Sequence, residues 1–117
     1  MANTNRLSVN RDLDRLHDLL IAVNEELSDS LNGITDPDLA RGVVTEMREV
    51  VHRIDLVQSL LFSASSNRIT AAVAKVEQAN AALTAALKSI TDLTTLVKHV
   101  AGFLALVDKA IDLAKVL

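Results

Sequence analysis

Apolar side chains recur along the chain in alternating steps of four and three, the spacing of a stripe on one face of an α-helix. The first stripe consists of Val9, Leu13, Leu16, Leu20, Val23 and Leu27. The second consists of Ala40, Val43, Met47, Val50, Ile54, Val57, Leu61 and Ala64. This rhythm predicts helices over residues 8–31 and 37–63, each with one face turned toward a core.

Turn signals separate these stripes. Glycine and proline gather in residues 32–37, where they indicate a turn. Asp36 is expected to cap the second helix, and Pro37 suits the first helical position, which needs no N–H donor. A second turn is expected over residues 63–67, where serine and asparagine side chains compete for backbone hydrogen bonds. Ser66 or Asn67 would then cap the third helix.

The remaining stripe changes phase near Ile90. Its members are Ile69, Val73, Val76, Asn80, Leu83, Leu87 and Ile90, and it continues through Leu93 and Val97 with two adjacent steps of three. One interpretation is a tight turn over residues 89–92, which gives four helices, the last two over 67–90 and 92–117. The other is three helices, the last being long and locally overwound. The turn is favoured because four helices of similar length suit an up-and-down bundle.

These elements predict an all-α, antiparallel up-and-down bundle with coiled-coil-like packing, in one domain over residues 8–117 after a flexible segment of residues 1–7. The 117 residues suit one core. Uncharged stretches fall far short of the roughly 20 apolar residues of a membrane-spanning helix. Residues 1–10 lack the apolar run of a secretory signal. We therefore expect a cytoplasmic protein.

Composition narrows the function classes. The chain has no cysteine, which excludes disulfides, thiolate zinc sites and cysteine nucleophiles. A net charge of -3 and 2% aromatic residues argue against a nucleic-acid partner. All seven arginines and eleven of fifteen acidic residues lie in residues 1–68, whereas all five lysines and twelve of sixteen alanines follow. The two helical pairs therefore differ in surface, which suggests different roles.

One spacing resembles a metal-ligand motif. Glu49 and His52 form a Glu-x-x-His sequence, with a looser echo at Asp14 and His17. Di-iron bundles project such side chains into the core. Because Val50 lies in the apolar stripe, His52 is expected on the opposite, solvent-facing side. No catalytic triad or phosphate-binding glycine loop is present. We therefore predict no enzymatic activity, no metal and no cofactor.

Two features concern packing between helices. Asn80 occupies a position in the third apolar stripe, where a buried asparagine can fix register and helix number. The alternative is an asparagine rotated to the edge of the bundle. Ala72, Ala79 and Ala86 recur every seven residues beside it and would let another helix approach closely, either within the bundle or from a partner.

The last helix has an apolar arc wider than the roughly 100° stripe of an ordinary surface helix. Either this helix is the most central one, or the surplus contacts a second copy, another protein or lipid. The residues expected to make such contacts are Leu96, Phe103, Leu106, Leu113 and Leu117.

We favour a non-enzymatic interaction protein with an adaptor, regulatory or assembly role. It would act through its C-terminal helical hairpin, on itself as a homo-oligomer or on another helical protein. The alternative is a membrane-active protein whose alanine-rich hairpin engages lipid. A third interpretation, a small apolar ligand between the helices, lacks a convergent set of polar groups to mark the site.

Overall fold

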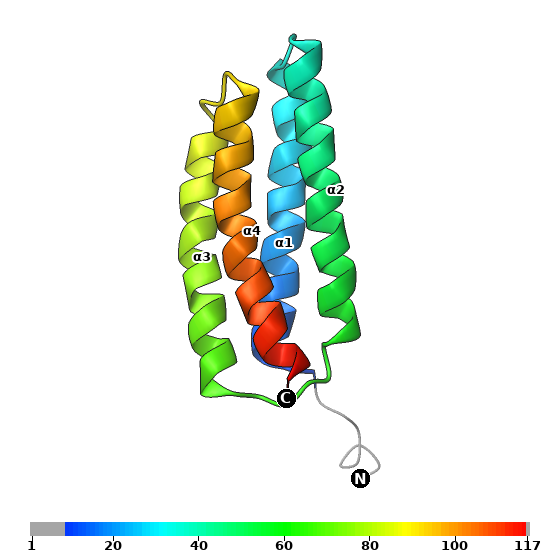
Figure 1. Ribbon diagram of the computed structural model, residues 1–117, viewed down its shortest axis with the longest axis vertical. Helices are drawn as coiled ribbons and strands as arrows, with labels where there is room; N and C mark the ends of the chain where they lie inside the picture. The colour runs from blue at the N-terminus through cyan, green and yellow to red at the C-terminus, as the bar shows by residue number, and fades with distance from the viewer. Residues whose placement is uncertain (1–8, 117) are drawn as a thin grey trace.

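The computed structural model describes residues 9–116, and every regular element within them is helical (Figure 1). The elements are α1 (Arg11–Ser30), the short 3-10 helix η2 (Leu31–Gly33), α2 (Pro37–Ser59), α3 (Asn67–Leu87) and α4 (Leu93–Lys115). The predicted all-α class is confirmed, and the break between α3 and α4 gives four helices instead of three. The expected flexible segment, residues 1–7, lies outside the described residues.

The four helices alternate in direction and pack as two hairpins, α1–α2 and α3–α4 (Figure 1). α1 also packs against α3 and α2 against α4, so neighbours across the two hairpins run in the same direction. The α2–α3 connection crosses one end of the bundle between diagonally placed helices (Figure 1). Each helix therefore contacts one antiparallel and one parallel neighbour.

Side-chain caps define where the helices begin. Asp36 accepts a hydrogen bond from the Asp38 N–H, and Pro37 opens α2 as expected. Ser66 caps α3 by accepting from the Arg68 N–H. Asp92 caps α4 by accepting hydrogen bonds from the N–H and the hydroxyl of Thr95. These bonds, the one from the N–H most strongly, lower the pKa of the Asp92 carboxyl. This cap begins α4 although no glycine or proline marks the turn.

The first helix begins later than its apolar stripe predicts. The Asn10 Oδ1 accepts from the N–H groups of Asp12 and Leu13 at 3.0 and 3.1 Å, so Asn10 caps α1. Val9, the expected first member of the stripe, lies before the helix and is exposed. The apolar spacing alone therefore overextends this helix toward the N-terminus.

Asn10 also holds the connection between the two hairpins. Its Nδ2 donates to the carbonyl oxygens of Ser63 and Ala64, both at 3.1 Å, and its N–H donates to the Leu61 carbonyl at 2.7 Å. Because these carbonyls bond to Asn10, the chain leaves the helix after Ser59, and the predicted extension of α2 to residue 63 is wrong. Ala64, the last residue of the second stripe, is exposed.

The core contains one apolar cluster with residues from all four helices. The stripe positions from Leu13 to Leu27 are fully buried, which confirms the inward face of α1. In α2 the stripe is only partly confirmed, because Met47 and Ile54 are half-buried. The other fully buried stripe residues are Val43, Val50, Val57, Ile69 and Val76. Val100 and Val107 of α4 are fully buried as well.

Two ion pairs join the hairpins. The Arg15 Nε lies 2.6 Å from the Glu77 Oε2, between α1 and α3. Between α2 and α4, the Nε and Nη2 of Arg53 each donate to Asp108 at 3.0 Å, and its Nη1 donates to Glu49 at 2.7 Å. The hydrogen bonds to Asp108 raise the pKa of Arg53. Both pairs combine an arginine of the first hairpin with an acid of the second.

Candidate functional site

The residues expected to form a surface on the last helix divide into two groups. Leu96 and Phe103 are 0% and 2% exposed and belong to the core, so neither presents an exposed contact surface in this fold. Their assignment to an exposed contact surface is corrected, because α4 packs against both α2 and α3. Leu106 and Leu113 are half-buried at the edge of the core. Leu117 lies outside the described residues.

α3 and α4 leave a groove along their seam, with two hollows that we together call the outer groove. One hollow, of about 320 Å³, is lined by Ala79, Ala82, Leu83, Lys98, His99, Gly102, Phe103 and Leu106. The other, of about 250 Å³ and nearer the start of α3, is lined by Arg68, Ala71, Ala72, Lys75, Lys109 and Leu113. The exposed edges of Leu106 and Leu113 therefore face the same groove.

Small side chains account for the hollows. Ala72 and Ala79, from the stripe predicted to allow close approach, line the α3 wall, and Ala86 follows one repeat later, half-buried. On the opposite wall, a Cβ added to Gly102 would meet nothing within 4 Å. The outer groove is therefore open at positions where larger side chains would fill it.

The walls of the outer groove carry positive charge. Arg68 and Lys75 lie on α3, and Lys98 and Lys109 lie on α4, with His99 beside Lys98. All five side chains are exposed, and none of the four permanent cations forms an ion pair with a residue in the described part of the chain. The groove thus combines an apolar floor with cationic edges.

The four acids of the second hairpin lie elsewhere. Glu77 bonds to α1 and Asp108 to α2, as described above. Asp92 caps α4, and Asp112 is exposed without lining either hollow. Among the described residues, no carboxylate lines the outer groove.

Asn80 is half-buried, and its Oδ1 is covered without a hydrogen-bond partner in residues 9–116. Asn24 on α1 has a covered Oδ1 in the same situation. A role in register needs a polar partner on a facing helix. Within the described helices the Asn80 Oδ1 makes no such bond, so that role stays a prediction.

The Glu-x-x-His segment lies on the surface. His52 and Glu49 are both exposed, as expected from the position of Val50, and Glu49 bonds to Arg53. His17 lies 3.3 Å from the Gln58 amide nitrogen instead of approaching Glu49. Within residues 9–116, no three His, Asp or Glu side chains are grouped as a metal ion would require.

Glu46 is a buried acid that the sequence prediction missed. Burial, reinforced by the charge of Glu49 and opposed by Arg53, raises the pKa of Glu46. It lies three residues after Val43 and four before Val50, so the stripe spacing could have placed it inward. Glu46 lines neither hollow of the outer groove.

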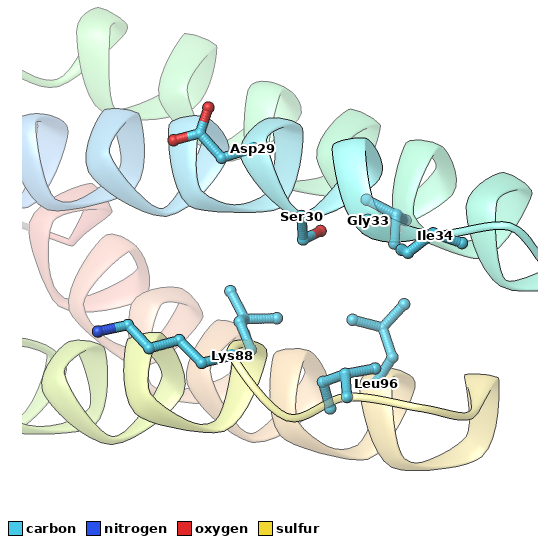
Figure 2. A pocket seen from close by; sticks show the side chains of 9 residues that line it. Asp29, Ser30, Gly33, Ile34, Lys88 and Leu96 are labelled. Carbon is cyan, nitrogen blue, oxygen red and sulfur yellow. The ribbon is translucent and has the colours of Figure 1, made fainter.

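A separate cleft of about 300 Å³ lies at the end of the bundle, between η2 and the α3–α4 turn (Figure 2). Its floor is apolar and includes the buried side chains of Val43, Leu87 and Leu96. Lys88, directly after α3, lines the cleft, whereas the Asp29 carboxylate points away from the gap in Figure 2. The cleft can take an apolar group, but it has no convergent set of polar side chains that would select a ligand.

Comparisons of the chain with protein-family models, curated proteins and solved structures found no match. Among the described helices, none is both long and apolar enough to cross a membrane. The outer groove extends along two helices and combines apolar side chains with unbalanced positive charge.

Proposed function

We propose that this chain is a non-enzymatic helical interaction protein, with an adaptor, regulatory or assembly role, whose outer groove receives a helix of another protein. One observation carries the proposal. The seam of the alanine-rich hairpin stays open, with hollows of about 320 and 250 Å³ that expose the edges of Leu106 and Leu113.

The shape of the outer groove supports a helical occupant. An amphipathic helix binds by laying apolar side chains into a groove between two helices, and small residues allow the backbones to approach closely. The walls supply Ala72, Ala79 and Ala82 on one side and Gly102 on the other. The two hollows follow one another along α3 and α4. Successive apolar side chains on one face of a partner helix could therefore enter them in turn.

Gly102 gives further support. Glycine in a helix interior costs about 1 kcal/mol relative to alanine. Close packing within the bundle does not explain it, because an added Cβ would find no neighbour within 4 Å. Close approach by a partner backbone is a physical reason for a glycine at this position.

Site-specific photo-crosslinking tests the proposal. A benzophenone side chain is placed at Ala82, which is exposed and lines the outer groove, or at Ala81, which is exposed and does not. The chain is then irradiated inside cells of the organism that encodes it. We expect a discrete adduct from position 82 and not from position 81, because only the first faces the docked helix. Gly102→Leu, which fills the hollow, should remove that adduct.

Two results would contradict the proposal. One is the same adducts from both positions, which would indicate random collisions. The other is an adduct from position 82 that survives Gly102→Leu. Flotation of the chain with liposomes, if abolished by Gly102→Leu, would instead support the lipid-binding alternative.

A further inference from the structure

We infer that the outer groove selects an acidic amphipathic helix, one whose apolar ridge is flanked by Asp or Glu on both sides. This inference rests on the proposed function and adds the chemistry of the partner. It depends on which charges of the second hairpin reach the outer groove and which do not.

The cations lie on both walls. Arg68 and Lys75 belong to α3, Lys109 faces them from α4, and Lys98 lies at the other hollow. A helix lying along the seam would therefore have positive charge on each side and near both ends. Carboxylates flanking its ridge would meet these cations at the partly desolvated edge of the contact, where opposite charges set specificity and association rate.

The net charge of the molecule does not reveal the positive charge along the outer groove. The chain as a whole is negative, at -3. The second hairpin directs Glu77 and Asp108 toward arginines of the first, on the sides that face away from the outer groove. What remains along the groove is cationic, so an acidic partner is attracted to one face of an acidic protein.

A second copy fits this face poorly. In a symmetric dimer the same patch meets itself, so the cations along the outer groove would face the cations of the second copy. Like charges across an interface are unfavourable. The charges therefore favour a different protein over self-association through this groove.

A lipid surface also fits less well. Proteins that adsorb to membranes insert large apolar side chains from a protruding face. Within residues 9–116, the exposed large apolar residues all lie outside the outer groove: Val9, Ile21, Val44, Val51, Phe62, Leu93, Val97 and Val116. A concave surface with recessed leucines suits a convex helix.

Two synthetic peptides of about six helical turns provide the test. Both carry the same Leu/Ala ridge, flanked by Glu in one peptide and by Lys in the other, and binding is followed by fluorescence anisotropy. We expect the Glu peptide to bind at least about tenfold more tightly at low salt, and to lose most of that preference at about 500 mM salt.

Charge reversal identifies the surface. The triple variant Lys75→Glu, Lys98→Glu, Lys109→Glu should prefer the Lys peptide. Lys115→Glu is the matched control, because Lys115 is an exposed lysine of α4 that lines neither hollow, and it should keep the original preference. Gly102→Leu should weaken binding of the Glu peptide by filling the hollow. Circular dichroism verifies that each variant is folded.

The inference is overturned if neither peptide is preferred, or if the preference survives the triple reversal. Flotation with vesicles containing phosphatidylserine that the triple variant abolishes would assign the cations to lipid and also overturn it. A groove-specific crosslink at position 82, together with equal binding of the Glu and Lys peptides, would contradict this inference but not the proposed function. The two failures are therefore distinguishable.

Discussion

The two hairpins share one architecture and both bury large apolar side chains, but they differ in the composition of their surfaces. The α1–α2 hairpin buries large leucine and valine side chains, and its surface mixes acids with arginines. The α3–α4 hairpin has twelve alanines and only four acids. One consequence is geometric, since small side chains leave the outer groove open between α3 and α4. The uneven composition of the chain thus becomes a difference between two faces.

The contacts between the hairpins explain the difference in charge. Arginines of the first hairpin bond to Glu77 and Asp108, which are half of the acids in the second. The lysines of the second hairpin line the groove or lie elsewhere on its surface. In the sequence, the uneven distribution of arginines and acids suggests two separate roles for the hairpins. In the structure, the same distribution also supplies the ion pairs that join the hairpins.

The largest expected effect separates core from groove within α4. Leu96→Ala removes a fully buried side chain and should lower the free energy of unfolding by about 2–5 kcal/mol. Leu106→Ala removes a half-buried one at the groove and should cost about 1 kcal/mol. Urea denaturation followed by circular dichroism measures both. Equal losses would place Leu106 in the core and weaken its assignment to a contact surface.

The next effect concerns the two ion pairs between the hairpins. The Arg53 side chain is 16% exposed and bonds twice to Asp108, whereas Arg15 is 53% exposed. Arg53→Ala should therefore cost about 1–2 kcal/mol of unfolding free energy, and Arg15→Ala at most about 0.5 kcal/mol. Double-mutant cycles with Asp108→Ala and Glu77→Ala isolate each pair. A stronger coupling for Arg15 would reverse the ranking.

A smaller effect comes from the buried acid of the first hairpin. Burial raises the pKa of Glu46, so the folded state binds its proton more tightly than the unfolded state. Protonation of Glu46 therefore favours the folded state at pH values below the ordinary pKa of a glutamate. This contribution to the free energy of unfolding is lost as the pH rises through the raised pKa of the folded state. Glu46→Gln should therefore stabilise the protein by up to about 1 kcal/mol at neutral pH and by less in acid. Urea unfolding of the unmodified protein and of Glu46→Gln, from acid to neutral pH, measures the difference in their free energies of unfolding. A difference that does not change with pH would refute the explanation.

The smallest effect compares two helical glycines. Gly102→Ala should raise stability by about 0.5–1 kcal/mol, because the new methyl group enters open space and alanine favours the helix. At Gly42 on α2, the added Cβ would overlap the Leu93 Cδ1, so Leu93 has to move and the gain should be smaller. Thermal unfolding compares the two variants. A destabilising Gly102→Ala would mean that Gly102 is needed by the fold itself.

Local signals predicted most of the fold. Apolar spacing located the helices, and the side chains of Asp36 and Ser66 act at the expected helix starts. The bonds of Asn10 to Ser63 and Ala64 escaped prediction because these partners lie more than fifty residues away along the chain. Its cap of α1 is local, so the sequence could have indicated it. Sequence spacing carries no information about such long-range bonds.

The candidate site was only partly predictable. The width of the apolar arc on α4 does not say which part its neighbours cover, and that depends on the order of the helices in space. With α2 and α3 on its two sides, Leu96 and Phe103 are buried while Leu106 and Leu113 remain at the edge. The cationic walls of the groove emerge only once the partners of Glu77 and Asp108 are known.

If the outer groove serves a different protein, this chain should leave the groove open when it is alone in solution. Light scattering over a wide concentration range tests it directly, with concentration taken from refractive index because the chain has no Trp or Tyr. We expect a mass near 12.6 kDa at every concentration, unchanged by Gly102→Leu. A dimer that Gly102→Leu converts to a monomer would contradict it, because the groove would then be filled by a second copy of this chain.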